Sequence, residues 1–289
     1  MDAEFILVRR SLEGSIKELP PLPTAVMKIL EVMARPDPSA VNVEAIVSAD
    51  PALTAKMLRV VNSAYYGLAR QISNIGQAVV ILGLQQVRNV TLAVGASSTF
   101  KGTGARHQEI LGQFWVHAFA TSATAGLLAK RQGIGRKEME EIQTCGLVHD
   151  IGRLFLYANF PKTFDRLVEV SRERGADFDS TELAMLGISH AKLGGQIAEK
   201  WGFPEGILNT IRDHEGPYES DPGAAAKIVN MADHLNKGSY RFLQELPAPT
   251  LDPLVAQYFE MPADEWTFLR ERTDLLVLEA SQSVGMLAA

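Results

Sequence analysis

The sequence predicts an all-α fold, and three observations lead to this prediction. Apolar residues recur at the three- and four-residue spacing of one helix face, as at Val26, Ile29, Leu30 and Met33. Prolines and glycines punctuate the chain between such segments, where helices start and stop. Alternation of apolar and polar residues, which is typical of a half-buried strand, is scarce.

The first third of the chain is expected to hold a series of short helices. Asp50 is a predicted N-cap, because its carboxylate can accept hydrogen bonds from the free amides of a helix start. Pro51 suits the first helical position, where no amide proton is needed. The expected helices cover residues 26–33, 43–48, 52–62, 73–82 and 84–97, and the last two are separated at Gly83.

A polar, glycine-containing stretch at residues 101–107 is expected to be a hinge between two lobes. We therefore predict a helical lobe over residues 1–100, a second lobe over 108–240 and a helical extension over 241–289. The expected helices after the hinge cover residues 108–131, 137–158 with a kink near Gly146, 162–174, 180–187, 190–201, 204–213 and 224–237, with two more in 253–287.

Composition narrows the class of protein. The chain has 289 residues, 46% hydrophobic and 21% charged, which is ordinary for a folded globular protein. Its net charge of −6 lacks the basic balance that nucleic-acid binding favours. No signal peptide or membrane span is visible, so we expect a cytoplasmic protein. Cys145 is the single cysteine, and one cysteine excludes both an internal disulfide and a thiolate-rich zinc site. We expect it to be a small buried residue.

The sharpest local feature is the pair His149-Asp150 within Leu-Val-His-Asp-Ile-Gly-Arg. Neighbouring side chains on a helix point about 100° apart. They can still meet at a metal centre, since an imidazole can bind one ion while a carboxylate bridges two. Gly152 would allow another backbone segment to approach closely. The alternative is a buried hydrogen-bonded pair that orients two helices.

Four further residues are candidate ligands, and each has a structural alternative. His117 could be a core histidine, His190 a solvent-facing helix start capped by Ser189, and Asp233 a solvated helix residue. His214, followed by Glu215, could be an exposed helix end. Mixed imidazole and carboxylate ligands suit iron, manganese, zinc or cobalt rather than calcium. The other two histidines, His107 and His234, are expected to be structural or surface residues.

The order of these candidates resembles the ligand series of the HD and HD-GYP phosphohydrolases. Motifs in the first lobe resemble a narrower group, the HDOD domain, which is the HD-related output domain of bacterial signalling proteins. The resemblance covers residues 15–220 approximately and implies a two-lobed helical fold, signal transduction, and a divalent transition metal, with iron or manganese favoured and up to two ions. The motifs are Leu19-Pro-Pro-Leu-Pro23, Asp50-Pro-Ala-Leu-Thr54, Asn62-Ser-Ala-Tyr-Tyr-Gly67 and Ala78-Val-Val-Ile-Leu-Gly83.

The sequence departs from the HD-GYP pattern at three places. Arg153 stands where that family usually has lysine, and the family's His-His-Glu is here Asp213-His214-Glu215. The Gly-Tyr-Pro loop is replaced by Gly216-Pro-Tyr218. These departures count against cyclic-dinucleotide hydrolysis and leave metal binding in place.

Two functions remain open at this point. The first is a signalling module that contacts a protein partner or a phosphate-bearing small ligand, with neither nucleic acid nor membrane as partner. The second is a metal-dependent phosphohydrolase or phosphodiesterase, in which Asp150 bridges the metals and Arg153 stabilises phosphoryl charge. An outer carboxylate, Glu215 or Asp213, would orient the water or hold an imidazole tautomer. The enzyme needs an open coordination position and a cationic pocket. For Arg153, a side chain that simply extends to water is an equal alternative.

Overall fold

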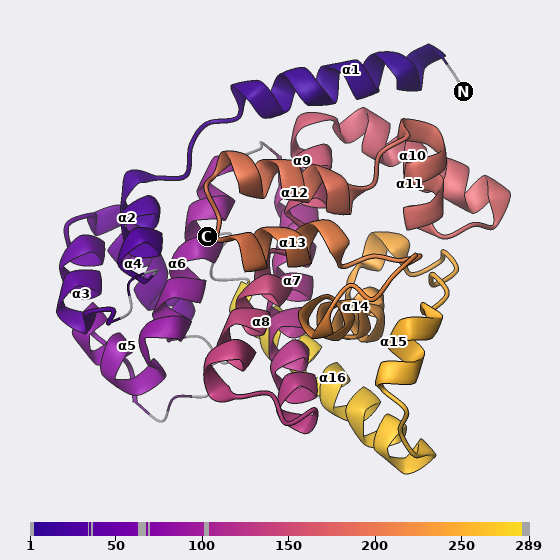
Figure 1. Cartoon of the computed structure of the whole chain (residues 1–289). Coiled ribbons are helices and arrows are strands. Elements are labelled where there is room, and N and C mark those ends of the chain that lie inside the picture. Colours follow the sequence, from indigo (N-terminus) through magenta and orange to yellow (C-terminus); the bar gives the residue numbers. More distant parts are fainter. Residues whose placement is uncertain are drawn as a thin grey trace. The chain divides into compact units, whose positions relative to one another are not determined.

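The computed structural model describes residues 3–33, 35, 37–62, 68, 70–100 and 104–284. Every regular element in these ranges is a helix and none is a strand, which confirms the predicted all-α fold (Figure 1). The chain divides into two compact units, Met1–Leu19 with His117–Val277 and Pro20–Val116 with Leu278–Ala289. Residues 101–103 of the expected hinge lie outside the described part.

The unit Pro20–Val116 is built on short helices whose ends follow from local chemistry. Asp50 caps α4 by accepting from the amides of Ala52 and Leu53 at 3.1 and 3.0 Å, with Pro51 at the first helical position, as predicted. Gly83, with φ of 84°, separates α5 from α6. These helices are α2 (Thr24–Met33), α3 (Ala40–Ser48), α4 (Pro51–Val61), α5 (Ile75–Leu82) and α6 (Leu84–Thr99).

One expected motif in this unit is only partly described. Asn62 ends α4, and its side chain bonds the carbonyls of Leu58 and Ile72 at 2.9 and 2.7 Å. The Asn62 side chain therefore satisfies backbone carbonyls at the end of this helix. Residues 63–67 lie outside the described residues.

The unit Met1–Leu19 with His117–Val277 carries the candidate ligands. Its first helix, α1 (Ala3–Glu18), was not predicted; it buries Leu12 and Ile16, and Lys200 donates to the Ile16 carbonyl at 2.8 Å. Two helices belong to this unit in part, α7 (Ala105–Arg131) from His117 on and α16 (Ala263–Val284) as far as Val277. The other elements are α8 (Arg136–Val148), α9 (Ile151–Asn159), α10 (Pro161–Arg174), α11 (Phe178–Leu186), α12 (His190–Lys200), α13 (Glu205–Asp213), α14 (Ala224–Asn236), the 3-10 turns η2 (Lys237–Ser239) and η3 (Arg241–Leu243), and α15 (Pro253–Tyr258).

The prediction of one kinked helix over residues 137–158 was wrong. Helix α8 ends at Val148 and α9 begins at Ile151, so His149 and Asp150 lie in the break. Gly146 leaves the helix unbroken and serves packing, since a Cβ there would lie 3.0 Å from the Cα of Ser122 on α7. The break removes the constraint that adjacent side chains on a helix diverge.

Within the described ranges, no single helix has both the length and the apolar character to cross a membrane. Helices α5 and α6 meet that test only as a pair, and the pair is bent by 119°. Cys145 is buried, as predicted.

Candidate metal centre

Two of the four central histidines are held by the same local arrangement. His149 directly follows α8, and His214 directly follows α13. Each ring Nδ1 faces the carbonyl oxygen three residues earlier, Gly146 at 2.8 Å and Ile211 at 2.7 Å. A carbonyl can only accept, so Nδ1 carries a proton and Nε2 is the nitrogen left to bind an ion. Both rings are fully buried, which excludes an exposed helix end for His214.

The other two histidines reach the same tautomer with different partners. His117 on α7 places Nδ1 3.2 Å from the Asn236 carbonyl, and His190, at the start of α12, places Nδ1 2.7 Å from Glu182 Oε2. Both rings are fully buried, so His190 does not face solvent, although Ser189 caps α12 as predicted. All four imidazoles therefore turn Nε2 inward, as metal-binding histidines with an outer hydrogen bond do.

The first donor group combines His117, His149, Asp150 and Asp233. The Nε2 atoms of His117 and His149 lie 3.2 Å apart, and Asp233 Oδ1 lies 3.0 Å from the first and 3.6 Å from the second. Asp150 Oδ2 lies 3.7 and 3.6 Å from the same two nitrogens. Donors that share one transition-metal ion at about 2.0–2.2 Å are separated by about this much. The group could therefore hold a metal ion.

A second donor group lies on the other side of Asp150. Asp150 Oδ1 is 3.1 Å from His190 Nε2 and 4.0 Å from His214 Nε2. Both Asp150 Oδ1 and His214 Nε2 are buried and find no hydrogen-bond partner among the described residues. Buried polar atoms without partners are uncommon, and a bound cation would satisfy both. Asp150 thus offers one oxygen to each group, and its position fits a bridging carboxylate.

The electrostatics keep His214 and the two aspartates in the form that binds a metal. At His149 and His190 the nearby carboxylates outweigh burial and raise the pKa of the ring, so a bound ion would have to displace a proton there. Burial, with His149 and His190 nearby, lowers the pKa of His214 to about 3, so this ring is neutral. Burial alone would raise the pKa of Asp150, but Arg153 beside it holds that pKa well below its usual range. Lys237 has the same effect on the pKa of Asp233. Neutral imidazoles and ionised carboxylates are the forms that bind metals.

Four residues around the centre were not predicted from the sequence. Glu182 on α11 accepts from the backbone amide of His190 as well as from its ring, both at 2.7 Å. Asp179 on α11 accepts from Arg153 and from Lys237. The Tyr240 hydroxyl donates to Asp150 Oδ2, and its ring stacks on that of His117 with the ring centroids 4.1 Å apart. Only Lys237 carried a usable signal, since it lies one helical turn after Asp233.

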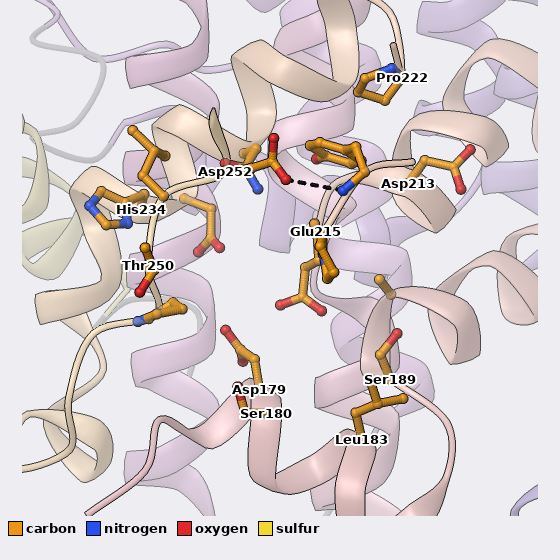
Figure 2. A pocket seen from close by; sticks show the side chains of 18 of the residues that line it. Asp179, Ser180, Leu183, Ser189, Asp213, Glu215, Pro222, His234, Thr250 and Asp252 are labelled. Atoms are coloured by element: carbon orange, nitrogen blue, oxygen red, sulfur yellow. Dashed lines mark hydrogen bonds between the residues drawn. The ribbon is translucent and has the colours of Figure 1, made fainter. Parts of the chain in front are cut away.

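A cavity of about 930 Å³ opens beside the centre, and its wall includes Asp179, Glu215, Asp233 and Lys237. In Figure 2, the carboxylates of Asp179 and Glu215 point into the same space. The full set of charged wall residues is dominated by acids: Asp177, Asp179, Asp213, Glu215, Glu219, Asp221, Asp233 and Asp252, against Lys192, Arg212 and Lys237.

The basic residues of this wall are already paired with wall carboxylates. Lys192 and Arg212 lie 3.3 and 2.8 Å from Asp213.

Burial raises the pKa of Glu215 to about 7, with Asp179 adding to the effect. His234, on the same wall, belongs to none of the donor groups of the described residues.

Glu182 should matter for stability because it satisfies two buried donors of one residue. In Glu182→Ala, the amide and ring N–H of His190 lose their acceptor, and we expect a loss of about 1–3 kcal/mol in the free energy of unfolding. Urea denaturation measures this loss. Glu173→Ala is the control, because the Glu173 side chain is 62% exposed and pairs only with Arg166 among the described ion pairs. Equal midpoints for the two variants would contradict the assigned role.

Comparison with known proteins points to one family. A model of the HDOD domain family matches residues 19–217. A solved structure from Shewanella amazonensis, named as a candidate phosphohydrolase, is 27% identical and covers 96% of this chain and 97% of its own, with a TM-score of 0.71. An HDOD domain protein of unknown function from Geobacter sulfurreducens is 25% identical, with coverage of 95% and 99% and a TM-score of 0.65.

A curated relative also matches along the chain. It is an uncharacterized protein of Treponema pallidum, 30% identical over 278 residues, which are 94% of this chain and 52% of that protein. The chain therefore spans about half the length of this relative. The family match ends at residue 217, before Asp233, Lys237 and Tyr240, which complete the centre.

Proposed function

Because the chain belongs to the HDOD domain family, we propose that it is a bacterial signal-transduction module that holds a divalent metal at its histidine–aspartate centre. Its output would pass through contacts with a signalling protein or a small ligand. The inward Nε2 atoms support the metal, and so do the oxygens of Asp150 and Asp233 that lack a hydrogen-bond partner among the described residues. We place the module in the cytoplasm, without nucleic acid or membrane as partner; the net charge of −6 supports the exclusion of nucleic acid.

The burial and the contacts of Arg153 favour a signalling module over an enzyme. The side chain is fully buried, which excludes the reading that it extends to water. One end donates to Asp150 Oδ2 at 2.9 Å and the other donates to Asp179. Lys237 is likewise held by Asp179 and by Asp233, at 3.1 Å. Both cations are thus already paired with carboxylates, whereas phosphoryl transfer needs positive charge that is free to bind the phosphoryl oxygens.

The charge of the cavity supports the same choice. Eight acidic and three basic residues line it, and a phosphate-bearing ligand would meet net repulsion there. Of the two kinds of partner open to a signalling module, this favours a protein over a phosphate-bearing ligand.

Phosphohydrolase activity remains the alternative, and one specific observation favours it. The first donor group has four donors, and the second leaves two donor atoms unpartnered within the described structure. A bound divalent ion would supply an acidified water at neutral pH. Glu215, whose pKa burial raises to about 7, lies 3.1 Å from His190 Nε2 and could accept a proton near the second group.

Metal content and turnover, measured on the same preparation, separate the two functions. We expect metal in the protein purified with Mn²⁺, and no release of p-nitrophenol from bis(p-nitrophenyl) phosphate above that of Asp150→Asn. Hydrolysis of nucleoside triphosphates and cyclic dinucleotides should also stay at that level. Turnover that Asp150→Asn abolishes would establish the enzyme instead. A parent protein without metal after loading would refute the metal-binding module.

A further inference from the structure

Resting on the proposed metal function, we infer that Arg153 occupies the ion position of a third donor group, Asp179 with His190 and Glu215. The guanidinium then sets how many ions the centre holds. Its role is that of a built-in cation, which differs from the binding of phosphate considered from the sequence.

The contacts of one nitrogen carry this inference. The ligand atoms of Asp179, His190 and Glu215 lie close enough to one another to hold an ion. Arg153 Nη2 donates to Asp179 Oδ1, lies 3.0 Å from His190 Nε2 and 3.7 Å from Glu215 Oε1. It therefore contacts all three donors of the group, and an ion placed among them would overlap with it.

The contrast with the first two groups strengthens the assignment. Those groups contain three buried donor atoms without a hydrogen-bond partner in the described residues, Asp150 Oδ1, His214 Nε2 and Asp233 Oδ1. Among the described residues, no oxygen of Asp179 or Glu215 belongs to the buried atoms that lack a hydrogen-bond partner. The first two groups therefore still contain donor atoms that a bound cation would satisfy, while at the third a protein cation already supplies the charge.

The charge balance explains why an ion should enter when Arg153 is removed. Its nitrogens neutralise Asp150 and Asp179 in a fully buried place. Without the guanidinium, buried carboxylates would face each other, and a divalent ion is the cation that can restore the balance.

Lys237 provides a matched control. It is a second cation of the cluster, and among the described residues its Nζ binds carboxylates alone, Asp179 Oδ2 at 2.5 Å and Asp233 Oδ2 at 3.1 Å. Removing it takes away the same charge from the same cluster and exposes no imidazole nitrogen. A transition metal should therefore not gain a site there.

The test is the number of Mn²⁺ ions per chain, determined by elemental analysis after loading and gel filtration. We expect Arg153→Met to hold one ion more than the parent and Lys237→Met to hold no more than the parent. An unchanged count in Arg153→Met overturns the inference, and so does an equal gain in both variants, which would make charge alone responsible. Far-UV circular dichroism establishes that each variant is folded.

A second variant covers the case in which Arg153→Met does not fold. Asp179→Asn keeps the size of the side chain and removes its charge. If Arg153 holds the third position, this variant keeps the ion count of the parent. The loss of one ion would show that an ion, rather than the guanidinium, lies there. A parent without any ion contradicts the proposed function, whereas the difference between parent and Arg153→Met still decides the inference.

Discussion

Replacing His149 with alanine is expected to remove most of the bound metal. His149 Nε2 lies within 3.6 Å of His117 Nε2, Asp150 Oδ2 and Asp233 Oδ1, so the change takes away a central donor of the first group. Loss of a residue that only supports a ligand typically costs 10- to 100-fold in affinity, and loss of the ligand itself should cost at least about 100-fold. Elemental analysis of the purified variant measures the remaining metal.

The matched control for this change is His234→Ala. His234 is a half-buried histidine of α14, next to Asp233 in the sequence, and belongs to none of the described donor groups. It should keep the metal content of the parent. Full stoichiometry in His149→Ala would disprove the assignment of the first group.

The second large effect is expected from Gly152→Ala. A Cβ at this position would lie 2.0 Å from the carbonyl oxygen of His190 and 2.5 Å from the amide nitrogen of Gly194. Both atoms are backbone, so α9 and α12 would have to move apart. Overpacking of a well-packed core costs about 1–3 kcal/mol and occasionally more, and a clash with backbone belongs at or above the upper end. Thermal denaturation should show a large fall in the midpoint.

Gly206→Ala is the control for this variant. Gly206 lies in α13, where nothing lies within 4 Å of an added Cβ. Alanine is the better helix former by about 1 kcal/mol, so the midpoint should stay or rise. If Gly152→Ala and the parent have the same denaturation midpoint, the close approach of α9 and α12 described above is wrong.

The sequence predicted the parts of the fold that depend on neighbouring residues. Asp50 and Ser189 cap helices as expected, since capping involves amides two or three residues away. Gly152 allows the close backbone approach that its position after His149-Asp150 suggested. Helix α1 was missed, because its stability depends on packing against α11 and on a bond from Lys200, both distant in the sequence.

The candidate site was predictable in its donors and not in its surroundings. The six candidate ligands do come together, in two groups that share Asp150. The break between α8 and α9 was placed three residues too early, since glycine suggested flexibility that the structure uses for packing. Glu182 and Tyr240 touch the centre only through the tertiary fold, so no spacing in the sequence marks them.

The donors of the centre come from segments that are far apart along the chain. His117 belongs to α7 and Asp233 to α14, while His149 and His214 follow two other helices. Metal bound by the two donor groups would link these segments in the folded state only, because the unfolded chain holds no such preformed site. Its binding energy would then add to the stability of the whole unit by mass action. Loading or removal of the metal would thereby change the resistance of this unit to unfolding.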